Sequence, residues 1–393
     1  MKQLSLSASY FFFFLSLSAS FFSFFLSSLF LGASLVFSFF NPRREALSKK
    51  NKWFFFFLTL PFIFTLISTA QSSNLTSAFD LLLKKTPFLM CPFILFKFNK
   101  LKSHQLRTFK IFITIPVLFI ALEGVINGFI FYFEKGLFFP QFAFNHIFRI
   151  QHTYLALYLL FCTILWFFSK PHLEKHEKIF AIIVASMTII VVVLVKARFA
   201  FFFLLFSFFL FVLKRASYSY LIPFLLAIAV SFFFMGDKFH SILSGNEARI
   251  LFWECAISLI NNNTFFSGIP VGDLQELLNS CYYNETMQLG FENKNTHNQL
   301  LDLLVTGGIF AFLLYCYVAV KVFISHKPLL FRLPFILIFI MSLTENIFER
   351  QFGILFICIC ISLTFIYSEN ENNRNRHWLR RPSNRNLLGR GRQ

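Results

Sequence analysis

Charged residues are scarce in this sequence. Asp, Glu, Lys and Arg make up 14% of its 393 residues, whereas 57% are hydrophobic and 65 are phenylalanine. A water-soluble protein needs far more polar surface than this composition supplies. The composition therefore excludes a soluble domain and indicates an integral membrane protein.

The hydrophobic residues lie in solid runs and not in an alternating pattern. Residues 199–213 and 221–234 are almost unbroken apolar stretches, close to the roughly 20 residues that cross about 30 Å of hydrocarbon as a helix. Strands of a membrane β-barrel alternate between lipid-facing and lumen-facing side chains, so they do not give such runs. We therefore expect an all-α membrane protein, a polytopic helical bundle.

Acidic residues are half as numerous as basic ones, 18 against 36, and the net charge is +18. In a soluble chain this excess would suggest a nucleic-acid partner, but here membrane topology explains it and we expect no nucleic acid. The basic residues gather between apolar runs and in the tail from Asn373, and the positive-inside rule places these segments in the cytoplasm. With both termini inside, the apolar stretches predict about twelve crossings: 9–24, 25–40, 52–70, 77–96, 109–131, 152–169, 179–196, 199–213, 219–235, 306–323, 329–345 and 351–367.

Three details of this predicted topology can be interpreted in more than one way. Residues 9–40 are interrupted only by serines and form either one long helix or two. Lys84 and Lys85 violate the positive-inside rule, and an interfacial start to the fourth helix is the only explanation we have. The first residues resemble a signal peptide without a small-residue cleavage site, so we expect them to be retained.

Cysteine is also scarce. The seven cysteines include no CxxC pair and no metal-ligand spacing, so we expect neither a metal nor a cofactor. Five lie in apolar segments, where packing is the expected role. Cys255 and Cys281 share one external loop, in which they either form a disulfide in an oxidising compartment or remain thiols.

Long connections are lacking except at 236–305. This loop divides the chain into an N-terminal transmembrane region of about nine helices at 1–235, the external loop at 236–305, C-terminal transmembrane helices at 306–367 and a basic cytoplasmic tail at 368–393. Long loops in compact proteins are usually functional or disordered. This one has helical patterns, so we interpret it as a small helical lid that carries the chemistry.

Two helices are predicted in the loop. The first covers residues 246–260, is capped by Asn246 and has an apolar face. The residues expected on that face are Ile250, Trp253, Ile257 and Ile260. After a turn at 267–273, Asp273 and Glu276 have the spacing of a capping box for a second helix, LQELLNSCYY.

Basic residues are rare in the loop, where eight acids outnumber three bases. Arg249 is either a site residue or an arginine that pairs with a neighbouring Glu or snorkels to the interface. Arg198 lies between two closely spaced crossings at the external membrane edge. An arginine there binds an anion or anchors the interface together with Lys196.

His297 lies where the loop meets the next crossing. In THNQ, Thr296 has the position of an N-cap and Gln299 completes a capping box, which makes His297 the first helical residue. The helix dipole opposes a charged ring there, so we expect a neutral imidazole that can act as a general base. The alternative is a histidine that merely occupies a helix start.

Four polar residues of the last hairpin, Glu345, Asn346, Glu349 and Arg350, are interpreted as a solvated external turn. The alternative is that they complete the polar mouth of a site. Sequence alone favours the solvated turn.

The second half of the chain resembles the O-antigen ligase family, bacterial membrane glycosyltransferases that include O-antigen polymerases. The resemblance lies in Arg198 between close helices, ARILFW with Arg249, the turn SGIPVGDLQELL, and THNQLLDLLVTGGIFAFLLY. RIQHTYLALYLL (149–160) is similar to a family segment that often reads HPTY. The turn also departs from the family, since Pro270 replaces a glycine.

The resemblance implies a metal-free transfer of a polysaccharide from undecaprenyl pyrophosphate to an acceptor hydroxyl, at the periplasmic face of the bacterial inner membrane. Arg198 and Arg249 would bind the pyrophosphate and His297 would deprotonate the acceptor, with Asn298 and Asp273 in support. The acceptor is lipid A core in a ligase and a lipid-linked repeat in a polymerase, and membrane lipids surround the protein. A transporter or flippase is the alternative of another class, but the internal repeats and midplane charges typical of transporters are lacking.

Overall fold

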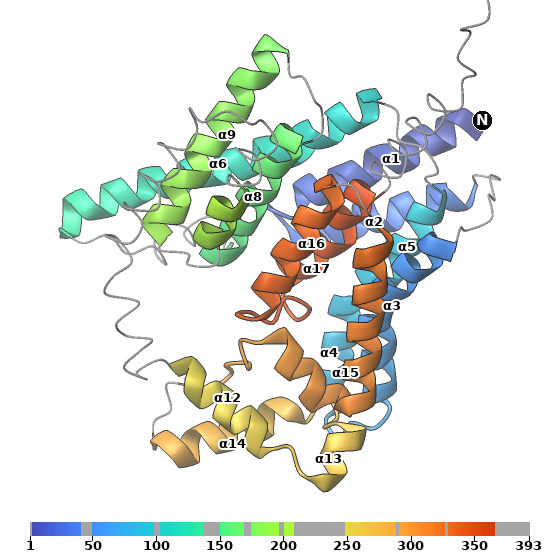
Figure 1. The fold of residues 1–393 in the computed structure, drawn as a ribbon, viewed down its shortest axis with the longest axis vertical. Coiled ribbons are helices and arrows are strands. Elements are labelled where there is room, and N and C mark those ends of the chain that lie inside the picture. Colours follow the sequence, from blue (N-terminus) through green and yellow to red (C-terminus); the bar gives the residue numbers. More distant parts are fainter. Residues whose placement is uncertain are drawn as a thin grey trace, which may run out of the picture.

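The computed structural model describes residues 2–40, 49–97, 103–136, 150–168, 174–195, 200–207, 248–287, 291–326 and 329–365, and every element in these segments is helical (Figure 1). This confirms the all-α class. The helices of the first half are α1 (Lys2–Ala19), α2 (Phe24–Phe39), α3 (Lys49–Thr69), α4 (Leu75–Lys85), α5 (Pro87–Lys97), α6 (Ser103–Lys135), α8 (His152–Phe168) and α9 (Lys175–Val195). Those of the second half are α12 (Ala248–Ser258), α13 (Asn262–Ser267), α14 (Leu274–Thr286), α15 (Gln299–Ser325), α16 (Leu329–Ser342), α17 (Gln351–Leu355) and the π-helical turn η3 (Phe356–Ile361).

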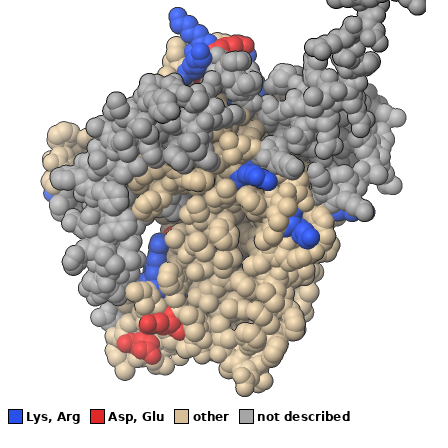
Figure 2. Space-filling model, viewed as in Figure 1, with Lys and Arg blue, Asp and Glu red and all other residues tan. Residues whose placement is uncertain are grey.

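Four of these helices are long and apolar enough to cross a membrane: Lys52–Thr69 of α3, Gln105–Lys135 of α6, all of α9 and all of α15. Large hydrophobic side chains are exposed along them, for example Phe310 on α15, and such surfaces are stable only against lipid or a partner. On the face of the molecule that Figure 2 shows, the described residues include few charged side chains. These are the features of a membrane protein. The count of twelve crossings stays a prediction, since the crossing expected at 219–235 lies outside the described residues.

Residues 9–40 form two helices. The chain turns at 20–23, and α1 and α2 then pack along each other through buried serines. The Ser9 hydroxyl donates to the Ser34 carbonyl oxygen at 2.9 Å, and the Ser34 hydroxyl donates to the Ser9 carbonyl oxygen at 2.8 Å. Small residues let two backbones approach closely, and hydroxyls can bond across the interface. The serines that interrupt this apolar stretch are therefore its packing surface.

The single helix expected at 77–96 is interrupted at Thr86 and forms two short helices, α4 and α5, which both pack against α3. A crossing by this segment stays a prediction. Each has 11 residues, too few to cross hydrocarbon alone. The break comes directly before Pro87, which has no backbone N–H to continue the helical ladder. The buried side of α4 includes Lys85.

The long helix α15 lies beside α3 (Figure 1) and is bent near its start. Gly308 has φ +68° within the helix, a left-handed conformation that favours glycine. The bend receives the turn between α13 and α14, where the Ile269 N–H donates to the Val305 carbonyl oxygen at 2.7 Å. The sequences VTGG and SGIP, far apart in the chain, thus form one packed junction.

The helices α12, α13 and α14 lie together at one end of the molecule (Figure 1), and we call them the lid. The lid has a small hydrophobic core of its own, formed by Phe252, Cys255, Ala256, Ile269, Leu274, Leu278, Tyr282 and Val305. Cys255 and Cys281 form a disulfide that joins α12 to α14. Both predicted lid helices are present, whereas the predicted capping residue Asn246 lies outside the described residues.

The apolar face predicted for α12 is wrong. Ile257, expected inside, is 57% exposed, and the buried residues of α12 are Phe252, Cys255 and Ala256. The disulfide requires Cys255 to face α14, and this sets which side of the helix is inside. A helical face inferred from Ile and Trp alone missed this covalent constraint.

Candidate functional site

Arg249 and His297 are brought together by one buried carboxylate, that of Glu345. Nη2 of Arg249 lies 3.4 Å from Oε1 of Glu345, and Nδ1 of His297 lies 3.3 Å from Oε2. The Glu345 side chain is 4% exposed, that of His297 16% and that of Arg249 36%. The three residues come from the turn after α16, the segment before α15 and the lid helix α12. A buried carboxylate is expensive unless its charge is paired, and here the two predicted site residues are its partners.

His297 does not begin the helix, so the predicted capping box is wrong. Asn298 is the N-cap of α15, and its side-chain oxygen accepts from the N–H groups of Leu300 and Leu301 at 3.0 and 3.1 Å. Asn is among the best N-cap residues and outcompetes Thr296, two positions earlier. His297 precedes the cap with φ +48°, a conformation uncommon outside glycine that concentrates at functional sites.

The turn after α16 is held by a network of side chains and is not the solvated turn that the sequence favoured. Asn346 is fully buried, and its Oδ1 accepts from the Thr296 hydroxyl at 3.1 Å and from the Asn298 N–H at 2.8 Å. Its amide nitrogen donates to Glu349 at 3.3 Å, and the Asn295 amide donates to the same oxygen at 3.1 Å. The alternative, a polar mouth, describes this turn better.

The imidazole of His297 is oriented for base chemistry. A carboxylate only accepts hydrogen bonds, so Nδ1 is the donor to Glu345. In the neutral form of the ring, Nε2 is then the nitrogen with the free electron pair. The ring also stacks on Phe252 of α12, with centroids 5.5 Å apart and planes inclined by 24°. The neutral state of the ring stays a prediction, and Glu345 sets which tautomer a neutral ring has.

No protein-family model matches this chain, and no curated protein matches it significantly. The resemblance to O-antigen ligases is therefore carried forward as a proposal. Arg198, the third predicted site residue, lies outside the described residues. Asn298 is close to the site through its bond to Asn346 and acts as a helix cap.

Asp273 has a structural role instead of the predicted cap. It directly precedes α14, yet its side chain makes no capping bond. Its carboxylate accepts from the backbone N–H groups of Ser73 and Asn74 at 3.0 and 2.8 Å, which joins the lid to the loop between α3 and α4. These two bonds lower the pKa of Asp273 below its usual value, because they stabilise the charged form.

We expect Asp273→Asn to lower the melting temperature at pH 7. A group with a lowered pKa in the folded state contributes stability above its unfolded pKa, about 3.9, and loses it as the pH falls through the folded value. The difference between wild type and variant should therefore shrink below about pH 4. Melting curves at pH 7 and pH 3 check this, with the exposed Glu276→Gln as control. An equal difference at both pH values would contradict this role for the carboxylate.

Two tyrosines near the site were not predicted. Tyr154, within the QHTY segment, is buried, interacts electrostatically with Glu345 and has a hydroxyl without a hydrogen-bond partner. Tyr282 of α14 packs against Phe252 with ring centroids 5.0 Å apart, and burial raises the pKa of its hydroxyl. Tyr154 lies in the quoted segment, but only its electrostatic interaction with Glu345 indicates that it lies near the site.

Metal ligands are not grouped in the described part of the chain, where no three His, Cys, Asp or Glu residues lie together. Glu345 is already engaged by Arg249 and His297. The arrangement suits an anionic ligand group at Arg249 and, beside it, a ligand hydroxyl that gives its proton to His297.

Proposed function

We propose that this protein is a membrane glycosyltransferase of the O-antigen ligase type. It transfers a polysaccharide from undecaprenyl pyrophosphate to a hydroxyl of lipid A core at the periplasmic face of the inner membrane. The observation that carries the proposal is the carboxylate of Glu345, which holds a guanidinium and an imidazole side by side. An anion site beside a general base is what a pyrophosphate-leaving transfer needs.

In the proposed reaction the acceptor hydroxyl attacks the anomeric carbon of the donor sugar. The bond between this carbon and the pyrophosphate oxygen breaks, its electron pair leaves with the lipid pyrophosphate, and the hydroxyl proton passes to Nε2 of His297. Glu345 balances the positive charge that the ring acquires. The lid carries Arg249, so the donor pyrophosphate binds to the lid beside His297.

Arg249 has donors to spare for a ligand. A guanidinium has five N–H groups, and the bond to Glu345 uses a single nitrogen, Nη2. With 36% of the side chain exposed, the rest of the fork is available to a phosphate. Planar, two-point binding of phosphate is the property that distinguishes arginine from lysine. Arg198 is proposed to bind the same pyrophosphate.

We expect Arg249→Lys to weaken donor binding about 10- to 100-fold, because hydrogen bonds to charged groups contribute about 1.5–3 kcal/mol each. The measurement is the concentration dependence of transfer with purified lipid-linked donor. The matched control is Arg107→Lys, an exposed arginine on α6. Unchanged binding and turnover in Arg249→Lys would show that Arg249 is only the partner of Glu345.

Two further conditions of the same assay test the proposal. Transfer in EDTA should equal transfer with Mg²⁺, since the proposed charge neutralisation comes from arginine. A loss in EDTA that Mg²⁺ or Mn²⁺ restores would contradict that assignment. The lipopolysaccharide of a deletion strain then identifies the acceptor: bare core indicates a lost ligase, whereas core with a single capped repeat indicates a lost polymerase.

A further inference from the structure

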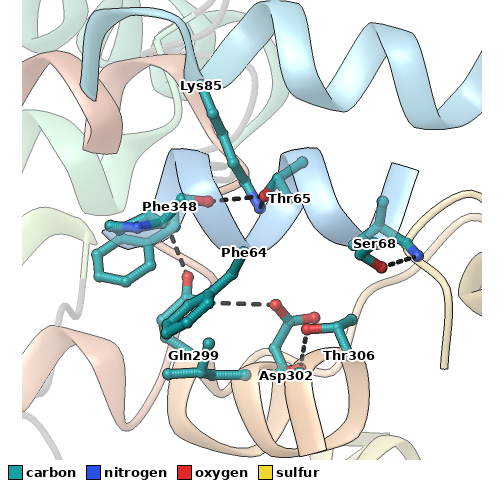
Figure 3. Close-up of a pocket in the computed structure, with 12 residues that line it drawn as sticks. Phe64, Thr65, Ser68, Lys85, Gln299, Asp302, Thr306 and Phe348 are labelled. Atoms are coloured by element: carbon teal, nitrogen blue, oxygen red, sulfur yellow. Dashed lines mark hydrogen bonds between the residues drawn. The ribbon is translucent and has the colours of Figure 1, made fainter. Parts of the chain in front are cut away.

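A second cluster of polar residues lies in a small cavity between α3, α4, the start of α15 and the lid turn (Figure 3). Two buried side chains of opposite charge line it, Lys85 from α4 and Asp302 from α15, with exposed fractions of 8% and 3%. Figure 3 shows them approaching from opposite sides of the cavity. The proposed transfer uses neither residue.

Both charged groups have unused hydrogen-bonding capacity. The Lys85 ammonium donates to the Thr65 hydroxyl at 2.9 Å, and an ammonium has three donors. Oδ2 of Asp302 accepts from the Gln299 amide at 3.2 Å, whereas Oδ1 is buried without a partner. Lys85 favours the charged form of Asp302, whereas the Glu349 carboxyl, which lies within hydrogen-bonding reach of Asp302, disfavours it. The charged atoms of Lys85 and Asp302 are not within the 4.0 Å of a direct salt bridge in the described structure.

A buried charge without a close counter-charge costs several kcal/mol. The cavity has room for a water molecule and offers the two to four polar partners that a buried water needs. The bridging group must accept from an ammonium and donate to a carboxylate, which a hydroxyl group does. The carboxyl groups of Asp302 and Glu349 lie beside each other, and two adjacent carboxyl groups in a buried site share a proton. Lys85 then balances the one negative charge that this pair carries.

We infer that Lys85 and Asp302 form a charge pair bridged by a water molecule, and that this pair positions the catalytic turn. Gln299 connects the pair to the turn that carries Glu345. Its amide nitrogen donates to Asp302, and its Oε1 accepts from the Phe348 N–H at 2.7 Å. Phe348 lies three residues after Glu345 in the same turn. The positioning role rests on the proposed function, whereas the charge pair does not.

A double-mutant cycle on the purified full chain tests the pair. Lys85→Met and Asp302→Asn should each lower the melting temperature by about 5 °C or more, because each leaves one buried charge unpaired. The double variant should be more stable than the worse single variant. Lys84→Met is the control, since Lys84 is the exposed neighbour on α4 and should leave the melting temperature unchanged.

The pairing would be overturned if the melting shift of the double variant equals the sum of the two single shifts, or if the double variant is no more stable than the worse single variant. If a single variant does not fold, recovery of folded protein in the double variant supports it. An experimental density map of the cavity with a water bonded to both Lys85 and Asp302 supports the bridge, and a direct contact without water overturns it.

Transfer kinetics test the positioning role. The double variant should lose turnover rate several-fold with little change in KM, because the donor site at Arg249 is intact while Glu345 is less well held. A change in KM alone would overturn positioning. If the wild type shows no transfer at all, the proposed function fails while the melting cycle still decides the charge pair.

Discussion

Loss of the His297 ring is expected to lower the rate of glycan transfer by about 10²–10⁴-fold, the usual contribution of a general base. The ring has one nitrogen fixed by Glu345 and the other free, and no other described residue at this place offers that combination. His297→Ala tests this, but alanine is strained at φ +48°. His297→Asn is the sharper variant, because asparagine tolerates the left-handed conformation and cannot accept a proton as a base.

Folding of these variants has to be shown separately. The Cys255–Cys281 disulfide and the melting temperature report on the lid, and both should be retained in His297→Asn. The exposed Lys294→Ala, in the same segment, should have wild-type activity. Transfer by His297→Asn at near wild-type rate would remove the base from the proposed mechanism and leave His297 as a packing residue on Phe252.

The sequence predicted most of the helices because each depends on local composition. Solid apolar runs of 15 residues or more specify helices in a membrane wherever they occur. Two features of 77–96 were not predicted: the break before Pro87, and the burial of Lys85, which donates to Thr65 on another helix. A positive-inside count treats every lysine as solvated, so it cannot represent a lysine that is paired inside the protein.

The candidate site was predicted only in part, because some of its residues stand out locally and others do not. Arg249 and His297 stand out locally, as a basic residue in an acidic loop and a histidine at a helix start. Glu345 does not, because its role depends on contacts 96 and 48 residues away in the chain. Nothing in the local pattern of a polar turn distinguishes a solvated glutamate from one that is buried between an arginine and a histidine.

The junction between the lid and α15 depends on two glycines for two separate reasons. Gly268 and Gly308 have φ +75° and +68°, and a Cβ atom on Gly308 would lie 2.2 Å from the Phe266 carbonyl oxygen. On Gly268 it would lie 2.3 Å from the Thr306 carbonyl oxygen. Both clashes are with backbone, which cannot move aside as a flexible side chain does. The two segments therefore fit together only if both positions lack a side chain.

Gly308→Ala is accordingly expected to destabilise the protein by about 2–5 kcal/mol, the sum of about 1–2 kcal/mol of backbone strain and about 1–3 kcal/mol of overpacking. The chain provides controls that separate the two causes. Gly136 has φ +69° with nothing within 4 Å of a new Cβ, and Gly272 has an ordinary φ with the Asn74 carbonyl oxygen at 2.2 Å. Gly136→Ala should show the strain alone and Gly272→Ala the clash alone.

The measurement is the melting temperature in detergent together with the fraction of protein that carries the Cys255–Cys281 disulfide. Gly308→Ala should lower both more than either control, because a junction that cannot close leaves the lid undocked and its cysteines free to mispair. Gly32→Ala, where the new Cβ would meet only Met90 Cε at 4.0 Å, should be neutral. If Gly308→Ala melts like Gly136→Ala, the close backbone contact does not exist in the folded protein. The lid would then be docked without this junction, through Asp273 and through the Val271 and Gly272 N–H groups that donate to Ser68 and Ser72. Arg249 would have less fixed support beside His297.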